Sequence, residues 1–160
     1  MARRRGTAVH GDGNGWVVCA QGHRHWGRFG AAGLLLRRRL QDATEVLMQH
    51  RAPWTANGDT WGLPGGARDS HESARETALR EAAEEAGVAP ESVCVLDELR
   101  DEHGGWHYTT VVAEACGRIR IVANEESLDL RWVAEAEIEQ LTLHPGFART
   151  WPLLRDRGRA

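Results

Sequence analysis

The chain has 160 residues, about the length of one domain and enough to bury a hydrophobic core. Its composition, 41% hydrophobic and 27% charged, is typical of globular proteins and excludes wholesale disorder. The formal net charge of -3 gives no basic surface for a nucleic-acid polymer, whereas a free nucleotide stays compatible because a metal ion can bring positive charge locally.

The two ends of the chain predict flexible tails, residues 1–15 and 156–160, because both are rich in arginine and poor in apolar residues. No apolar region follows the first arginines, so the pattern is not that of a signal peptide. No stretch is long and apolar enough to span a membrane. These observations predict a soluble cytoplasmic protein with a single domain over residues 16–155.

Three cysteines are spread widely along the chain, and no C-x-x-C occurs among them. Their odd number and wide spacing favour buried or unused thiols at Cys19, Cys94 and Cys116. Neither a disulfide framework nor a zinc knuckle is predicted.

The first half of the chain reads as strands that lead into a long loop. A strand and a loop are expected within residues 15–33, followed by a buried strand in "AAGLLLRRR" and a returning strand in "EVLMQHRA". The next segment, "PWTANGDTWGLPGGARD", is dense in Pro, Gly, Asn and Asp and predicts a loop that brings backbone close to a ligand.

A helix is predicted next, with Asp69 or Ser70 as its N-cap and Gly87 at its end. The second half then alternates again. Strands are expected in "SVCVLDELR", "WHYTTVVAEACG" and "LDLRWV", a short helix in "AEAEIEQL", and a last helix that begins near Pro145. This mixture predicts one α/β or α+β domain.

The predicted helix separates its carboxylates into two groups. At about 100° per residue, Glu81, Glu84 and Glu85 share one sector roughly 100° wide, and alanines occupy the opposite side. Glu72, Glu76 and Arg80 form a separate row at spacings of four, which predicts ion pairing along it. The crowded sector is explained equally by a solvated surface or by a bound divalent cation, for which Mg²⁺ is the best match to oxygen ligands.

The spacing of these residues resembles the Nudix box, G-x5-E-x7-R-E-U-x-E-E-x-G-U, with U an aliphatic residue. Gly66, Glu72 and the run from Arg80 to Val88 fill every glycine and charged position, and Ala82 stands where a larger aliphatic residue is commoner. The resemblance extends over about residues 28–155. It implies the Nudix fold, an α/β/α sandwich with a mixed β-sheet between helices.

The Nudix resemblance implies a hydrolase that cuts phosphoanhydrides of nucleoside diphosphate derivatives with Mg²⁺, or with Mn²⁺ in its place. Carried over by position, the metal ligands are Glu81, Glu84, Glu85 and the Gly65 carbonyl. Glu72 and Arg80 orient these carboxylates. A further catalytic carboxylate is expected before "LRWV", where Glu126 is the first choice and Asp129 the second.

The chain is also similar to MutT-type proteins of actinobacteria, including mycobacterial 8-oxo-dGTP diphosphatases, in "WGRFGAAGLLLR", "TWGLPGGARDSHE", "YTTVVA" and "LHPGFA". This resemblance implies hydrolysis of 8-oxo-dGTP to 8-oxo-dGMP and pyrophosphate, which sanitises the nucleotide pool. Arg51, Leu63 and Gly66 are the implied substrate-binding residues. The alternatives are a Nudix hydrolase of ADP-ribose or another nucleoside diphosphate derivative, and a Nudix-fold binding module without catalysis. The oligomeric state, monomer or homodimer, is left open.

The aromatic and histidine residues give weaker evidence about function than the Nudix box does. Among seven tryptophans, Trp132 is expected in the core, and Trp54, Trp61 and Trp106 are candidates for ligand contacts. The pairs His23/His25 and His103/His107 have loose metal-like spacing, but they lack a third ligand for zinc.

Overall fold

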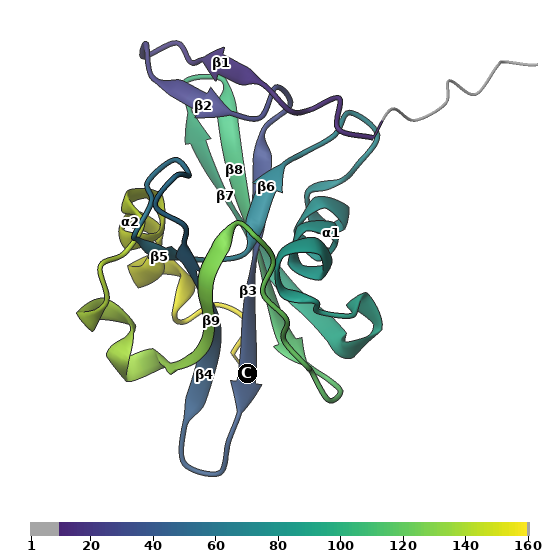
Figure 1. Cartoon of the computed structure of the whole chain (residues 1–160), viewed down its shortest axis with the longest axis vertical. Helices are drawn as coiled ribbons and strands as arrows, with labels where there is room; N and C mark the ends of the chain where they lie inside the picture. The colour runs from purple at the N-terminus through teal and green to yellow at the C-terminus, as the bar shows by residue number, and fades with distance from the viewer. Residues whose placement is uncertain (1–9, 160) are drawn as a thin grey trace, which may run out of the picture.

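The computed structural model describes residues 10–159 (Figure 1). Within these residues, nine strands and two α-helices follow one another, with two short 3-10 helices, η1 and η2, between them. Their bounds are β1 Trp16–Val18, β2 Arg24–Trp26, β3 Ala31–Arg39, β4 Thr44–Arg51, β5 Trp61–Gly62, β6 Gly65–Ala67, α1 Ala74–Ala86, η1 Pro90–Ser92, β7 Val93–His103, β8 Trp106–Ala115, β9 Ser127–Ala134, η2 Glu135–Gln140 and α2 Pro145–Leu154.

Seven of the strands form one mixed sheet. Its main order is β5-β4-β3-β8-β7, with β6 beside β3 and β9 beside β4. The pairing of β3 with β8 is parallel and the other pairings are antiparallel. The mixed sheet that the sequence analysis expected is therefore present.

Strand β3 changes partner along its length, and this change opens the sheet. Its last residues, Arg37–Arg39, pair with the start of β4, whereas its first residues, Ala31–Gly33, pair with β6. Beyond Val46, β4 leaves β3 and continues beside β9 (Figure 1). The side chain of Gln49 lies in this opening and contacts helix α1 through Glu85.

Helices cover both faces of the sheet, so the fold is a three-layer α/β/α sandwich (Figure 1). Successive side chains of a strand point to opposite faces. Leu35 accordingly packs with residues of α2, and its neighbours Leu34 and Leu36 pack with the alanines of α1. Ala78, Ala82 and Ala86 are fully buried there, because small side chains let the helix lie close to the sheet.

The first two strands form a separate hairpin that crosses the end of the β7–β8 ladder (Figure 1). The indole Nε1 of Trp106 donates to the Gly27 carbonyl at 2.8 Å, and the Ala20 amide donates to the Gly104 carbonyl at 2.8 Å. The segment before the hairpin, part of the predicted N-terminal tail, is held by Asp69, which accepts hydrogen bonds from the amides of Gly11 and Gly13. Residues 1–9 of that tail lie outside the described range.

The expectation of unpaired thiols was wrong for two of the three cysteines. Cys94 and Cys116 form a disulfide, while Cys19 is free and buried. The two partners are separated by 22 positions, but β7 and β8 pair as a long antiparallel hairpin that brings its open ends together. Such a pairing depends on strand register, which cysteine spacing alone does not reveal.

No helix within residues 10–159 combines the length and the apolar character needed to cross a lipid bilayer.

Candidate active site

Helix α1 begins at Ala74, later than the sequence analysis expected. Its N-cap is Ser73, whose hydroxyl accepts from the Glu76 amide at 3.1 Å while the Glu76 carboxylate accepts from the Ser73 amide. This is a complete capping box. The predicted caps, Asp69 and Ser70, were wrong because their side chains are engaged with the segment before β1.

The helix ends where the sequence predicted. Gly87 adopts a left-handed conformation with φ 68°, and its amide donates back to carbonyls of the last turn. A residue without Cβ adopts this conformation at little cost. The carboxylates between the two caps therefore lie on a helix with both ends satisfied.

Arg80 connects the helix to the turn that precedes it. Its guanidinium donates to both oxygens of Glu72, at 2.7 and 2.8 Å, to Glu81 at 2.8 Å and to the carbonyl of Ala67 at 3.1 Å. The predicted row Glu72–Glu76–Arg80 was wrong in geometry, because Glu72 precedes the helix and Glu76 closes the capping box. The ion pair between Glu72 and Arg80 is present, and it positions the next residue, Glu81.

Glu85 is the most buried carboxylate of the cluster, with 4% of its surface exposed. Its Oε2 accepts from the Gly65 amide at 3.1 Å and from the Gln49 side chain at 3.2 Å. Burial, followed by the negative charges of Glu81 and Glu126, raises the pKa of Glu85 to about 9. A group with this environment holds a proton unless a cation neutralises the cluster.

Glu81 lies against the backbone of the loop before the helix. Burial raises its pKa, although Arg80 acts in the opposite direction. A Cβ added at Gly66 would lie 2.6 Å from the Glu81 carboxylate, so only glycine leaves room for this carboxylate. Gly65 is equally confined, since its Cβ would lie 2.6 Å from the carbonyl oxygen of Ala32. The two glycines therefore allow a backbone strand to lie beside the carboxylates of Glu81 and Glu85.

The other two predicted carboxylates are more exposed. Glu84 has 48% of its side chain exposed and lies 3.4 Å from Arg80. Glu126 lies before β9, is exposed, and is close enough to raise the pKa values of Glu81 and Glu85. Asp129, the second choice, is paired with Arg131 at 2.7 Å. The structure thus brings Glu81, Glu85 and Glu126 together, with Glu84 at the rim.

The residues of this cluster fit a hard divalent cation. Carboxylates at this density repel one another, and oxygen donors are what Mg²⁺ and Mn²⁺ prefer. The Oε1 atom of Gln49, next to Glu85, is buried and has no hydrogen-bond partner within residues 10–159. Such an unpaired oxygen is a further ligand atom, which a cation would satisfy either directly or through a water molecule.

A second acidic group has metal-like geometry but other contacts. Ligand atoms of Asp12, Asp69 and His71 lie within 4.8 Å of one another. Asp69 accepts from two backbone amides, and Asp12 accepts from the Ser70 amide and hydroxyl. These contacts attach the N-terminal segment to the loop before α1.

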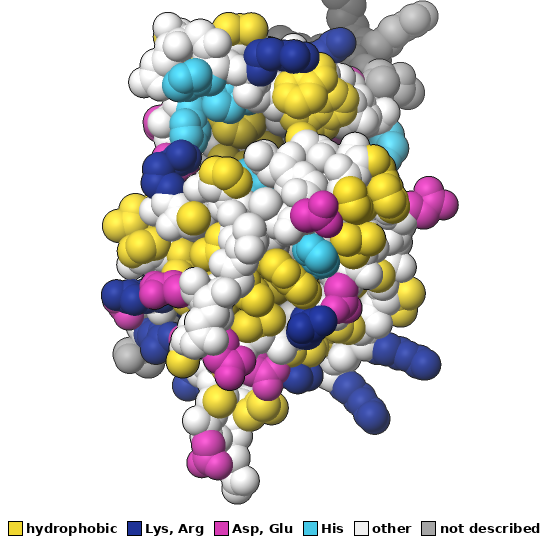
Figure 2. All heavy atoms as spheres, turned by 60° about the vertical axis from the view of Figure 1, so that its left-hand side comes forward, with side chains coloured by type: hydrophobic (Ala, Val, Ile, Leu, Met, Phe, Trp, Pro, Cys, Tyr) yellow, Lys and Arg dark blue, Asp and Glu magenta, His cyan; other side chains and the backbone are white. Residues whose placement is uncertain are grey.

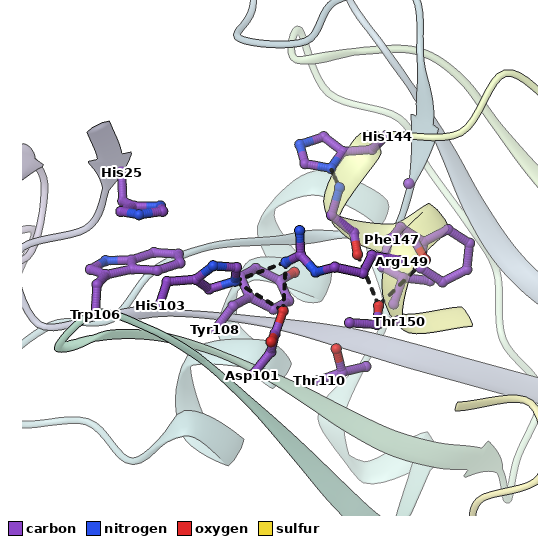
Figure 3. A pocket seen from close by; sticks show the side chains of 13 residues that line it. His25, Asp101, His103, Trp106, Tyr108, Thr110, His144, Phe147, Arg149 and Thr150 are labelled. Atoms are coloured by element: carbon purple, nitrogen blue, oxygen red, sulfur yellow. Dashed lines mark hydrogen bonds and ion pairs between the residues drawn. The ribbon is translucent and has the colours of Figure 1, made fainter. Parts of the chain in front are cut away.

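A cavity of about 250 Å³ lies on the α2 side of the sheet, below the β1–β2 hairpin (Figures 2 and 3). Figure 2 shows histidine side chains gathered at the hairpin end of this face, beside a recess with hydrophobic walls. The lining comes from the hairpin, the loop around Leu63, strands β7 and β8, and helix α2: His25, Gly62, Leu63, Asp101, His103, Trp106, Tyr108, Thr110, His144, Gly146, Phe147, Arg149 and Thr150.

One side chain connects this cavity with the carboxylate cluster. Tyr108 lines the cavity, and its hydroxyl lies 2.8 Å from the position of a Cβ added at Gly65. The amide of the same Gly65 donates to Glu85. Gly65 of β6 therefore lies between a side chain of the cavity wall and the most buried carboxylate of the cluster.

The polar end of the cavity is an ion-paired group (Figure 3). Arg149 donates to Asp101 at 2.7 Å, and His103 lies 2.9 Å from the same carboxylate oxygen. These contacts lower the pKa of Asp101, against the effect of burial. At the other end, burial lowers the pKa of His144 to about 4, and its Nδ1 accepts from the Gly146 amide as the N-cap of α2.

The predicted substrate-binding residues take different places. Leu63 lines the cavity and belongs to the core cluster beside α2. Arg51 ends β4, where its side chain donates to the Ala56 carbonyl at 2.9 Å. Trp106 lines the cavity as one of the three candidate tryptophans, whereas Trp61 is buried against His50 and Trp54 is 74% exposed.

Sequence reasoning missed most of the cavity. His25 and His103 had been noticed only for metal-like spacing, and Asp101, Tyr108 and Arg149 had no local signal at all. Their side chains converge from β2, β7, β8 and α2. The glycine turn between His103 and Trp106 was the one available cue, because a tight hairpin places its flanking residues side by side.

Known proteins resemble this chain over nearly its whole length. The family pattern described as the NUDIX domain matches residues 27–155. A Mycobacterium tuberculosis protein with the provisional name 8-oxo-dGTP diphosphatase 3 is 54% identical over 159 residues, covering 92% of this chain and 71% of that protein. A nucleoside triphosphate pyrophosphatase/Nudix hydrolase fusion protein of Bifidobacterium longum is 46% identical over 155 residues, covering 93% of this chain and 32% of the fusion protein.

A solved structure agrees with these matches. The crystal structure of RenU, a Nudix hydrolase from M. smegmatis, superposes with a TM-score of 0.84 at 49% identity, covering 90% of this chain and 94% of RenU. The sandwich described above is therefore the Nudix fold, as the sequence predicted. Together with the NUDIX match over residues 27–155, this places the chain in the Nudix hydrolase family.

Proposed function

We propose that the chain is a Mg²⁺-dependent pyrophosphohydrolase of a nucleoside triphosphate, with 8-oxo-dGTP as the substrate. The observation that carries this proposal is that Gly65 lies between Glu85 of the carboxylate cluster and Tyr108 of the cavity wall. The name of the M. tuberculosis relative supports the choice of nucleotide. The reaction adds water to 8-oxo-dGTP and gives 8-oxo-dGMP and pyrophosphate, which would remove an oxidised precursor from the nucleotide pool.

The proposed mechanism gives the acidic side chains on helix α1 a different role from Glu126, which lies before β9. Glu81, Glu84, Glu85 and the Gly65 carbonyl would hold the metal, with Mn²⁺ as a substitute for Mg²⁺. A bound divalent ion neutralises the phosphates and makes water more acidic. Glu126 is exposed and lies outside helix α1, so it is suited to accept the proton of the attacking water and return it to solvent. Arg80 and Glu72 hold Glu81 in place through the contacts already described.

The cavity would hold the base of the nucleotide. Its walls include the aromatic side chains of Trp106, Tyr108 and Phe147, which suit a planar ring. Its volume of about 250 Å³ is below the usual range for drug-sized ligands and suits one nucleobase better than two. This limit favours a nucleoside triphosphate over a dinucleotide or ADP-ribose.

A substrate panel tests the proposal. The purified chain is incubated with Mg²⁺ and, separately, 8-oxo-dGTP, dGTP, CTP and ADP-ribose, and the products are resolved by ion-exchange chromatography. The expected result is the highest kcat/KM for 8-oxo-dGTP, with pyrophosphate and the monophosphate as products. Preference for ADP-ribose by orders of magnitude would make the chain a different Nudix hydrolase, and absence of any turnover would make it a binding module.

Metal dependence needs its own measurement. Removal of divalent ions with a chelator should stop turnover, and added Mg²⁺ or Mn²⁺ should restore it. Undiminished turnover after chelation, checked by metal analysis, would refute the metal-site assignment.

A further inference from the structure

One wall of the cavity comes from outside the part of the chain that matches the NUDIX domain. The match begins at residue 27, whereas the β1–β2 hairpin, residues 16–26, precedes it. This hairpin places a single side chain, His25, among the residues that line the cavity. The hairpin therefore adds a contact that the matched domain itself does not provide.

The position of His25 is fixed by its neighbours. Its ring stacks on Trp106 with centroids 4.2 Å apart and planes 8° from parallel (Figure 3). The Trp106 indole is in turn held by its hydrogen bond to the Gly27 carbonyl. The His103 ring lies 5.3 Å from that of His25 on another side. The imidazole is thus an ordered part of the cavity wall.

His25 also has an unused polar atom. Its Nε2 is buried and has no hydrogen-bond partner among residues 10–159. Burial lowers the pKa of His25, so the ring is neutral at pH 7 and each nitrogen is either a donor or an acceptor. Buried polar atoms are rarely left unpaired, because an unmade hydrogen bond there is costly.

We propose that His25 is a specificity-determining residue, whose Nε2 forms a hydrogen bond with the edge of the nucleobase held in the cavity. The inference rests on the proposed function, since it takes the occupant of the cavity to be the base of a nucleotide. A planar ring with polar edge atoms matches this wall better than a phosphate does, because the imidazole is neutral and aromatic side chains surround it. The hairpin then sets base preference, while the carboxylates beyond β6 act on the phosphates.

Binding of nucleoside monophosphates to the metal-free protein tests this inference without any need for turnover. Affinities for 8-oxo-dGMP, dGMP, dAMP and dCMP are measured by calorimetry for the wild type, His25→Phe and His23→Phe. Phenylalanine at position 25 keeps a flat ring against Trp106 and removes the hydrogen bond. His23 is an exposed residue of the same hairpin turn and serves as the matched control.

The expected result is a preferred base in the wild type and an affinity for it about tenfold weaker in His25→Phe, close to the value for the other bases. His23→Phe should equal the wild type. In the turnover assay the same change should raise KM for the preferred nucleotide rather than lower kcat. A second variant, His25→Gln, retains a hydrogen-bonding group and should keep part of the preference; it decides the question if His25→Phe does not fold.

Two results would overturn the proposal: the same affinities and the same order of bases in His25→Phe as in the wild type, or no selective binding by the wild type. Failure of the proposed function gives a different pattern. If no triphosphate is hydrolysed but selective binding is present and lost in His25→Phe, the reaction is wrong and the role of His25 stands.

Discussion

Arg80 and Glu72 are eight residues apart, yet the guanidinium of one contacts both carboxylate oxygens of the other, at 2.7 and 2.8 Å. Glu72 lies in the turn before α1 and is almost fully buried. The pair therefore fastens the start of the helix to its second turn. The same guanidinium also contacts Glu81, so a structural ion pair and a proposed metal ligand share one cation.

Replacing Arg80 with alanine should destabilise the fold by about 1–3 kcal/mol, because Glu72 would be left buried without its partner. Urea unfolding monitored by tryptophan fluorescence measures the change. Arg75→Ala, at an exposed position on the same helix, is the control and should change stability by less than about 0.5 kcal/mol. Equal effects of the two substitutions would contradict the role of the Arg80–Glu72 pair.

Glu85→Gln should strongly reduce kcat/KM. Loss of a residue that only supports a metal ligand lowers activity roughly 10- to 100-fold, and loss of a ligand itself should lower it more. The amide has nearly the same shape and can still accept from the Gly65 amide. Stability of the metal-free protein at neutral pH should not fall, since Glu85 with its raised pKa is already uncharged there and the amide is uncharged too. Thermal unfolding shows whether stability changes along with activity. If the variant turned over substrate with Mg²⁺ as fast as the wild type, Glu85 would not be a metal ligand.

Gly66→Ala should lower activity more than stability. The added Cβ would lie 2.6 Å from the Glu81 carboxylate and force that side chain to move. We expect a loss of at least about tenfold in kcat/KM. Gly117→Ala, where the nearest atom to the added Cβ is the Ser92 hydroxyl at 3.3 Å, is the control. Retention of full activity in Gly66→Ala would show that the position of Glu81 is not critical.

Ser73→Ala should cost about 1 kcal/mol, because it removes the side chain that caps α1. The comparison variant is Ser70→Ala, at one of the two positions that sequence analysis favoured as the cap. Ser70 is exposed and bonds to Asp12, so its loss should have a smaller effect. A larger effect at Ser70 would indicate that the helix begins earlier in solution.

His144 should lower stability as the pH is lowered from about 6.5 toward 4, whereas the raised pKa of Glu85 favours the fold over the same range. Burial, aided by the charges of Arg51 and Arg149, lowers the pKa of His144 to about 4 in the fold. Between the folded pKa of about 4 and the ordinary value of about 6.5, only the unfolded chain takes up the proton. The proton uptake of His144 therefore leaves the free energy of unfolding unchanged above pH 6.5. Between pH 6.5 and 4 it lowers this free energy, by on the order of 1–3 kcal/mol.

The measurement is the denaturant midpoint at pH 7 and at pH 5 for the wild type and for His144→Asn. Asparagine can cap α2 in the same place but does not titrate. Between pH 7 and pH 5 this variant should lose less stability than the wild type, because the titrations of Glu85, His25 and His107 are common to both proteins. An unchanged slope in His144→Asn would refute the assignment.

Short sequence signals predicted those helices and strands whose limits depend on neighbouring residues. The apolar run at 31–39, the glycine at the end of α1 and the proline at the start of α2 each mark an element through the conformations they permit. The start of α1 was misplaced because Asp69 and Glu72 have the composition of a capping box but are engaged elsewhere, by Gly11, Gly13 and Arg80.

The sequence pattern did not predict which residues from distant parts of the chain meet in the fold. The cluster around Glu85 was expected from one contiguous motif, whereas Gln49 reaches it from β4, in the opening of the sheet. The cavity depends on several separate elements, and none of its polar residues is adjacent to the motif in sequence. The register of β7 and β8, which brings Cys94 to Cys116 and His103 to Trp106, is set by the whole ladder rather than by any short segment.

That ladder is closed at both ends. The turn at Gly104 and Gly105 joins its strands beside the cavity, and the Cys94–Cys116 bridge joins them at the far end. Strand β7 lies at the border of the sheet, with β8 as its neighbour on one side. A border strand tied at both ends cannot slide by one residue pair or separate from one end, so the covalent loop fixes the register that places Asp101 and His103 in the cavity wall.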